Sequence, residues 1–259
     1  MWGIAGYSFD ETFDVDPLHA ARILIATVAE RGADAAGCAF LSDGRIEILK
    51  QPGGASSFIE HLHLEPHVRH ALLHVRDFTK GTPSLMANNH PIRHGSVVGV
   101  HNGKISNDDD VFRLLGVARD EPGMTVDSEA IFAALHHAHD PKRALETLQG
   151  SLACGWLDAS MPDRVFLARG YGRPLWIGKS LHGSAVMWAS TLEALEIAED
   201  LIGVSLHKRP MRPGSILQVK DGLIIASERF QPDASASWLM NPIASPHERE
   251  ACLARIQTA

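Results

Sequence analysis

The sequence predicts an α+β protein in which two antiparallel sheets are covered by helices. Helices and strands come in blocks, whereas a parallel wound sheet would show strand and helix alternating. Several apolar runs are joined by tight turns of the hairpin type, as at Ser42-Asp43-Gly44. The chain of 259 residues is 45% hydrophobic, so it can bury a substantial core.

The first half of the chain begins with a strand and a helix. Residues 1–8 (MWGIAGYS) are apolar and suit a strand, and the Asp-Pro pair at 16–17 opens a helix that ends near Gly32. The helix over 106–116 has Ser106 or Asn107 as its N-cap and acids in its first turn. The other elements expected up to residue 150 are a hairpin (35–54), two strands (70–76, 96–105) and three helices (55–64, 127–140, 141–150).

From residue 151 the pattern changes to short strands with one helix. The expected strands cover 151–159, 163–170, 174–178, 185–190 and 215–227, and the helix covers 191–201. We therefore expect one domain over 1–230, followed by a C-terminal tail over 231–259. The tail carries an apolar group in a polar stretch, namely Trp238, Leu239, Met240 and Ile243. Such a group either folds back on its own domain or acts as a docking arm on a partner.

Composition excludes several classes of function. A net charge of −7, a pI near 6.1 and the lack of a Lys/Arg stripe argue against nucleic acid as a partner. The three cysteines Cys38, Cys154 and Cys252 have no CxxC spacing, so neither a disulfide framework nor a zinc site is expected. No leader or membrane-spanning run is present, so we expect a soluble cytoplasmic protein, or part of a particle assembled inside the cell.

Three stretches contain residues that suit binding or catalysis. Arg76 ends a strand before a loop that reaches Gly81, where a guanidinium can hold a carboxylate, although such an arginine is commonly structural. Asn102 and Gly103 offer a side-chain amide and a backbone N–H together, as an oxyanion hole requires, although Asn-Gly is also a routine turn. Asp127 opens a helix, either as a plain N-cap or as a partner for a substrate ammonium group.

Five stretches in this order resemble the glutaminase domain of class II glutamine amidotransferases, an N-terminal nucleophile (Ntn) hydrolase family. The matching segments are MWGIAGYS, ERGADAAGCAF, HVRDFTKGTPSLMANNHPI, VGVHNGKISN and VDSEAI, and the hairpins after residue 150 follow the same family. The resemblance extends from residue 1 to about 230. It implies a four-layer αββα sandwich, the Ntn-hydrolase fold.

The resemblance also implies roles for individual residues. Arg76 would hold the glutamine α-carboxylate and Asp127 its α-ammonium group, while Asn102 and Gly103 would stabilise the oxyanion. Thr79, in the loop after Arg76, would also contact substrate.

Three residues of that loop depart from the family pattern. Asp77 replaces tryptophan, Phe78 replaces alanine and Lys80 replaces histidine. These changes affect the loop that closes over glutamine in the family.

The decisive departure is Trp2, which stands where the family has its nucleophilic cysteine. In the family that cysteine becomes the first residue, and its own α-amine acts as the base. An indole supplies neither a thiol nor a base. A second residue as large as tryptophan is expected to leave Met1 in place, about 3.8 Å of chain before the usual position of the amine. We expect the indole to plug the pocket and to leave glutamine binding millimolar at best.

No metal or cofactor is expected. The histidine-rich stretch 61–74 contains i,i+4 pairs, but Pro66 breaks their register and no HExxH or paired-cysteine pattern accompanies them. The histidines at 136–139 read as the polar face and end of a helix. Cys38 and Cys154 lie in expected strands, where a free cysteine acts as a small hydrophobic residue.

Two hypotheses follow. In the first, the chain is a non-catalytic member of the amidotransferase fold and serves as a binding or structural module, with a protein partner or a homo-oligomer. In the second, it is an active amidohydrolase or amidotransferase subunit that has recruited another nucleophile and releases ammonia for a separate enzyme. The first is favoured because Trp2 removes the nucleophile.

Overall fold

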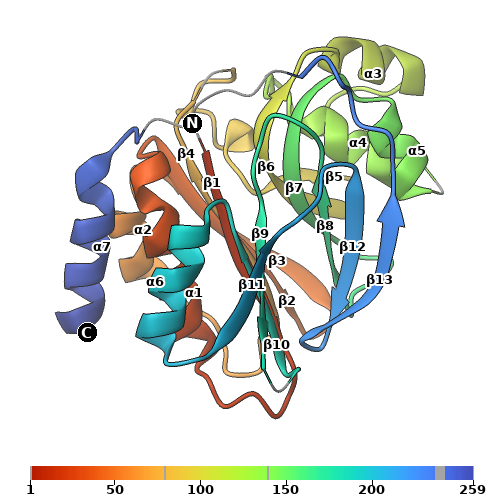
Figure 1. Cartoon of the computed structure of the whole chain (residues 1–259). Helices are drawn as coiled ribbons and strands as arrows, with labels where there is room; N and C mark the ends of the chain where they lie inside the picture. The colour runs from red at the N-terminus through yellow and green to blue at the C-terminus, as the bar shows by residue number, and fades with distance from the viewer. Residues whose placement is uncertain (1, 79, 139, 182, 237–242, 259) are drawn as a thin grey trace.

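Four layers make up the structure, with two antiparallel sheets packed face to face and helices covering both outer faces (Figure 1). This computed structural model describes residues 2–78, 80–138, 140–181, 183–236 and 243–258. The arrangement confirms the α+β class and the αββα sandwich. No helix in these ranges combines the length and the apolar character that a membrane crossing needs.

The first sheet has seven strands in the described part of the chain. In spatial order they are β11 (Leu206–Pro210), β9 (Trp176–Ser180), β10 (Ala185–Ala189), β1 (Trp2–Phe9), β4 (His70–Arg76), β2 (Ala35–Ser42) and β3 (Arg45–Pro52). Its outer face is covered by α1 (Pro17–Val28), the short helix η1 (Ala29–Arg31), α2 (Ala55–His61), α6 (Leu192–Ile202) and α7 (Pro246–Thr258). The N-terminal strand therefore lies at the centre of its sheet, between β10 and β4.

The second sheet has six strands in the same ranges. They are, in order, β13 (Leu223–Arg229), β12 (Ser215–Lys220), β8 (Val165–Arg169), β7 (Gly150–Asp158), β6 (Val97–Ile105) and β5 (Ile92–His94). Its helices are α3 (Asp108–Leu115), α4 (Glu129–His137) and α5 (Pro141–Glu146), and the short helix η2 (Met86–Asn88) precedes β5. Every strand pair in both sheets is antiparallel.

Alternation along the strands divides the core into three apolar clusters. On β1, Ala5 and Tyr7 pack toward α1, whereas Ile4 packs in the space between the sheets. On β6, Val98 and Val100 face the same space. The third cluster lies between the second sheet and α4. Side chains at alternate positions of β1 and β6 consequently meet in the middle of the sandwich.

Helix boundaries follow local capping chemistry. The carboxylate of Asp16 accepts hydrogen bonds from the N–H groups of Leu18 and His19 at the start of α1. Asn107 is the N-cap of α3, but its side chain bonds Thr147 and Gln149 instead of the helix. The helix α2 ends at His61, earlier than expected from the sequence, before the extended Leu62.

The last helix, α7, packs on its own domain. Cys252 is fully buried within the cluster formed with α1 and α2, and the carboxylate of Glu248 accepts hydrogen bonds from the N–H and hydroxyl groups of Ser56. Arg249 pairs with Glu30 at 2.6 Å. The apolar residues Trp238, Leu239 and Met240 of the tail lie outside the described residues, and Ile243 is 57% exposed. The helical part of the tail thus covers this chain's own surface.

Candidate functional site

The first strand brings Trp2 into the space between the two sheets. Trp2 is the strand partner of Arg76, and its carbonyl accepts a hydrogen bond from Arg31 Nε at 3.0 Å. By alternation its side chain lies on the same face of β1 as Ile4. The indole is 3% exposed, and its ring centre lies 6.1 Å from that of His101 on β6. An aromatic ring therefore fills the end of the interlayer space.

The indole is packed closely, but its hydrogen-bonding capacity is not satisfied. Trp2 Nε1 is buried and has no hydrogen-bond partner among the described residues. Behind it, a Cβ added at Gly3 would come within 2.8 Å of the side chains of Val28 and Val75, so β1 sits tightly on α1. The strand cannot shift outward to relieve the ring, which makes Trp2 a fixed part of the site.

Arg76, the last residue of β4, uses its guanidinium on its own protein. Nη1 donates to Asn89 Oδ1 at 2.6 Å, and Nη2 donates to the carbonyls of Lys80 and Gly81 at 2.8 and 2.6 Å. Arg76 is 1% exposed, and burial lowers its pKa to about 10, against the opposing effect of Asp127. The arginine stays charged at neutral pH and holds the loop that follows it.

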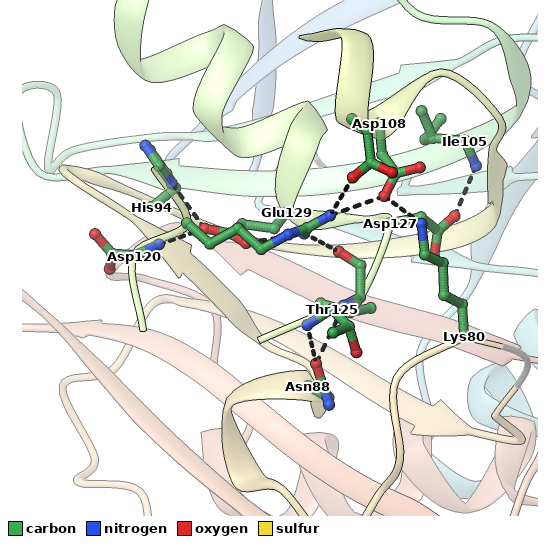
Figure 2. A network of polar contacts seen from close by, with 12 residues as sticks. Lys80, Asn88, His94, Ile105, Asp108, Asp120, Thr125, Asp127 and Glu129 are labelled. Atoms are coloured by element: carbon green, nitrogen blue, oxygen red, sulfur yellow. Dashed lines mark hydrogen bonds and ion pairs between the residues drawn. The ribbon is translucent and has the colours of Figure 1, made fainter. Parts of the chain in front are cut away.

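The two asparagines of the NNHP segment, residues 88–91, complete this loop. Asn88 Oδ1 accepts hydrogen bonds from the N–H groups of Thr125 and Val126 at 2.8 and 3.1 Å (Figure 2). Asn89 Nδ2 donates to the Pro83 carbonyl at 2.8 Å. The segment before β5 therefore joins the loop after β4 to the loop before α4. Thr79, in the first of these loops, lies outside the described residues.

Lys80 ties the same loop to α3. Its ammonium lies 2.5 Å from Asp108 Oδ2, and Arg119 Nη2 donates to the same oxygen at 2.9 Å. Arg119 also pairs with Glu129 at 3.2 Å, and Glu129 contacts His94 at 3.0 Å. Figure 2 shows these groups as one connected network. Lys80 is thus a structural link between the two halves of the sandwich.

Asn102 and Gly103 lie on β6, beside β7. Asn102 is fully buried, and neither its Oδ1 nor its Nδ2 has a partner among the described residues. Asn102 lies two residues after Val100 on β6, so both side chains are on the same face of the strand. That face looks into the interlayer space that also holds Trp2. Gly103 has a φ of +153°, and a Cβ there would approach the Ser151 carbonyl to 1.9 Å. A buried unpaired amide costs about 1–3 kcal/mol, so this site retains an unfavourable polar group.

Asp127 lies just before α4 and is 1% exposed. It is not the N-cap, a place taken by Ser128; its Oδ2 instead accepts a hydrogen bond from the Ile105 N–H at 2.7 Å. Its Oδ1 has no partner among the described residues. Burial raises the pKa of this carboxyl, the negative charge of Asp108 adds to the rise, and the ammonium of Lys80 opposes it. The hydrogen bond from the Ile105 N–H also opposes the rise.

Three buried histidines lie next to the site. The rings of His74 and His90 stack at 4.2 Å, and His74 Nε2 lies 3.1 Å from the carbonyl of His101. Burial lowers the pKa of His74 and of His101 to about 3 and that of His90 well below its usual value. All three are neutral at neutral pH. In the sequence, His74 was singled out only as a member of the histidine-rich stretch 61–74 that was weighed as a metal site. Among the described residues, no group of three or more potential metal ligands exists.

Two buried arginines were not singled out from the sequence. Arg31 and Arg173 are each 5% exposed, and burial and the charge of Arg173 lower the pKa of Arg31 to about 10. Arg31 lies within the ERGADAAGCAF segment, one of the five that carry the family resemblance. That position was the one signal in the sequence that could have marked Arg31 as a site residue.

The cysteines are inert in this setting. Cys38, Cys154 and Cys252 are free and fully buried. Burial raises the pKa of Cys154 and of Cys252 to about 12, and that of Cys38 further. A thiolate is the reactive form, so none of these thiols is activated at neutral pH.

Open space lies elsewhere on the molecule. Four surface hollows of the described residues are lined by other side chains, and none includes Trp2, Arg76, Asn102 or Asp127. The structure thus brings four predicted site residues to one end of the interlayer space, where the Trp2 ring is buried.

Comparison with known proteins agrees with this geometry. Residues 75–197 match a family model described as a glutamine amidotransferase domain. The glutamine–fructose-6-phosphate aminotransferase of Pseudomonas aeruginosa is 34% identical over 163 residues, which are 58% of this chain and 26% of that protein. The enzyme of the same name from Clostridium acetobutylicum is 29% identical over 197 residues, 72% of this chain and 31% of that protein. This chain therefore spans between a quarter and a third of these relatives.

Solved structures share the fold. A glutamine phosphoribosylpyrophosphate amidotransferase from B. subtilis, complexed with ADP and GMP, superposes with a TM-score of 0.69 at 21% identity, covering 88% of this chain and 49% of that one. A structure described as the allosteric regulatory enzyme of purine biosynthesis gives 0.68 at 20% identity, covering 88% and 48%. At this level of identity the likeness establishes the fold alone.

Proposed function

We propose that this chain, which carries a class II glutamine amidotransferase-like domain, is a non-catalytic member of that fold and acts as a binding or structural module in a larger assembly. The observation that carries the proposal is the position of Trp2. Its indole is buried at the end of β1, between the sheets, where the family places a cysteine thiol. An indole has no atom able to attack an amide carbon at neutral pH.

The state of Arg76 supports the same conclusion, because this protein's own groups occupy its guanidinium. Arg76, which would hold a carboxylate, bonds Asn89 and two loop carbonyls. Asp127, which would hold an ammonium group, bonds the Ile105 N–H through Oδ2, and the Lys80 ammonium near this site is paired with Asp108. Glutamine would have to displace three internal interactions before it could bind.

A recruited nucleophile is disfavoured by the thiol environments. An active enzyme would need another attacking group, and burial keeps the thiols of Cys38 and Cys154 protonated. Asn102 retains the buried amide of an oxyanion hole, but without a nucleophile it has no tetrahedral intermediate to stabilise.

The proposed assembly follows from what the relatives look like. In them the matching region is about a quarter to a third of a longer protein. A domain of this kind usually works beside other domains, so we expect this one to contact a protein partner or a second copy of itself, in the cytoplasm.

The proposal is tested by assaying the purified chain for ammonia and glutamate release from glutamine. We expect no turnover above the uncatalysed background. If turnover is seen, the double variant Cys38→Ala/Cys154→Ala separates the possible origins. Activity that persists in this variant would overturn the non-catalytic assignment, and activity lost in it would identify a recruited thiol and overturn it equally.

A further inference from the structure

A hollow of about 700 Å³ lies where the chain crosses from one sheet to the other. The crossing leads from β11, an edge strand of the first sheet, to β12, next to the edge strand β13 of the second (Figure 1). This place is separate from the Trp2 site. Its volume is within the range of about 300–1,000 Å³ that small-molecule sites occupy.

The floor of the hollow is apolar. Ile177 on β9, Met211 in the crossing and Leu217 on β12 line it, and all three belong to the core cluster between the sheets. They are at most 6% exposed. The hollow is therefore the open end of the interlayer space, where the two sheets part and no further apolar side chain of the described residues closes the gap.

The rim is cationic. Arg209, Arg212 and Arg229 line the hollow together with the hydroxyls of Ser215 and Ser227, and no lining residue is an aspartate or glutamate. Within the described ranges none of these three arginines forms an ion pair with a carboxylate. The chain as a whole has a net charge of −7, so three arginines without acidic partners around one hollow concentrate positive charge there against the overall charge of the protein.

Strand geometry explains why these groups converge. Arg229 and Ser215 are strand partners, as are Ser227 and Leu217, so all four lie on the face of the second sheet that looks toward the first. The guanidinium of Arg229 donates to the Ser215 hydroxyl.

On β11, neighbouring residues point to opposite faces. Lys208 pairs with Glu199 of α6 on the outer face, which leaves Arg209 on the inner face, opposite Ile177. The outer cation is neutralised by an acid, and the inner one is not.

A buried arginine supports the crossing from below. The guanidinium of Arg169 donates to the carbonyls of Met211 and Arg173. Arg169 is 6% exposed and adds positive charge beneath the floor. The backbone of the hollow is thus held rigidly, as a preformed binding site requires.

We propose that this arginine-lined hollow binds a phosphorylated small molecule. The phosphate would lie on the guanidinium groups of Arg209, Arg212 and Arg229, whose planar forks match phosphate oxygens in pairs. The organic part would cover Ile177, Met211 and Leu217. The proposal does not depend on the state of the Trp2 site, and either assignment can fail without the other.

The test is calorimetric titration of the full chain with phenyl phosphate, which carries both the anion and an apolar ring. We expect saturable binding of one molecule with a submillimolar Kd, and inorganic phosphate at least about tenfold weaker because it cannot use the floor. Arg212→Gln and Arg229→Gln should each weaken binding by about tenfold or more. Arg212 lies in the crossing outside any strand, so its variant should fold normally, and thermal unfolding checks both.

The matched control is Arg45→Gln, which removes one exposed arginine from β3 at the opposite edge of the first sheet and should bind like the unaltered chain. Three outcomes would overturn the proposal. They are no saturation by phenyl phosphate up to about ten millimolar, equal affinity in the Arg212 variant, and a poly-glutamate peptide that binds tighter than phenyl phosphate and competes with it. The last result would assign the hollow to an acidic protein segment.

Discussion

The ammonium of Lys80 lies 2.5 Å from the carboxylate of Asp108 and so fastens the loop after β4 to the first turn of α3. The two residues belong to opposite halves of the sandwich, because β4 is in the first sheet and α3 covers the second. Asp108 has only 5% of its side chain exposed, so the pair is screened less than a surface ion pair. The ion pair therefore keeps the loop after β4 fastened to the other half of the sandwich.

We therefore predict that Lys80→Gln loosens the loop without unfolding the domain. Hydrogen exchange of residues 80–85 should accelerate about tenfold, because the opening equilibrium loses roughly 1–2 kcal/mol of ion-pair energy. Lys142→Gln removes an exposed lysine of α5 and should leave this exchange unchanged. Equal exchange in the Lys80 variant and the unaltered chain would mean that the Arg76 and Asn89 contacts alone hold the loop.

Trp2→Cys is the substitution with a physical reason to create glutaminase activity. A small second residue allows Met1 to be removed, which would place a thiol and an α-amine together at the end of β1, on the side of Asn102. Activity should be partial, because a misplaced loop can cost about a hundredfold in rate. Ammonia release, and labelling of residue 2 by a glutamine-like electrophile, measure the gain.

Trp2→Ser provides the matched control for this experiment. It also allows removal of Met1 and opens the same space, but it supplies a far weaker nucleophile. Adding Asn102→Ala to Trp2→Cys should reduce turnover by about a hundredfold or more, as loss of an oxyanion donor does. A Trp2→Cys protein that is folded, has lost Met1 and still neither reacts with the electrophile nor hydrolyses glutamine would contradict the assignment of this site.

Glutamine should bind the unaltered chain no tighter than millimolar. The indole is buried in the space that the glutamine side chain would need, and the guanidinium of Arg76 is engaged by Asn89 and two loop carbonyls. Calorimetry measures this directly. The double variant Trp2→Ala/Lys80→Gln should bind glutamine more tightly than the unaltered chain, because it removes both the ring and the internal cation. A micromolar Kd for the unaltered chain would show that the site is open in solution.

Stability should fall as the pH drops below about 6.5. The folded-state pKa values of His74 and His101 are lowered to about 3, chiefly by burial, with the charge of Arg76 adding to the effect at His74. The unfolded chain therefore binds more protons than the folded chain between pH 3 and 6.5. In that range each buried neutral histidine lowers the free energy of unfolding by about 1.4 kcal/mol for every pH unit of acidification. Above pH 6.5 this contribution is fully present.

Urea unfolding at pH 7 and at pH 5 measures this slope. His74→Gln, whose amide can still reach the His101 carbonyl, should reduce the loss of stability by about 1–2 kcal/mol over that interval. His63→Gln, at an exposed position, should leave it unchanged. If the three proteins lose stability in parallel, the buried histidines do not determine the acid response.

The docking of α7 can be followed through Cys252. The thiol is fully buried, so modification by a thiol reagent requires that the helix detach. Glu248→Ala removes the carboxylate that accepts hydrogen bonds from the N–H and hydroxyl groups of Ser56. This loss should weaken the docking of α7 by about 1 kcal/mol and speed modification of Cys252 roughly fivefold. Cys38 and Cys154, in the central sheets, should not change. If the rate at Cys252 is unaffected by Glu248→Ala, α7 opens without breaking this contact.

Most strands and helices could be predicted from the sequence, because alternation and turn residues are local signals. The elements β5, β11 and α7 were not predicted: β5 and β11 are short edge strands, and α7 lies in the stretch that was interpreted as a tail. The αββα arrangement and the convergence of Arg76, Asn102 and Asp127 required the family resemblance, since those residues are brought together by strand pairing across long separations. Asp127 illustrates the limit, because its carboxylate bonds Ile105 of another strand and not the helix it precedes.

The roles of Asn88, Asn89 and His90 could not be predicted locally. The segment looks like a turn before a proline, and its function depends on which backbone groups the fold places around it. The sequence analysis singled out Lys80 as differing from the pattern of the resembling family. Its partner Asp108 lies 28 residues away in the sequence, so the ion pair could not be predicted before the fold was known.

The central position of β1 ties the Trp2 ring to the stability of the whole fold. In an edge strand a terminal tryptophan could be exchanged at little cost, but here the ring is packed at the junction of both sheets. Truncating such a buried aromatic side chain costs about 3–5 kcal/mol, a large part of the stability of a typical domain. Replacing Trp2 by a small residue is therefore expected to lower the free energy of unfolding unless other side chains fill the space that the ring leaves.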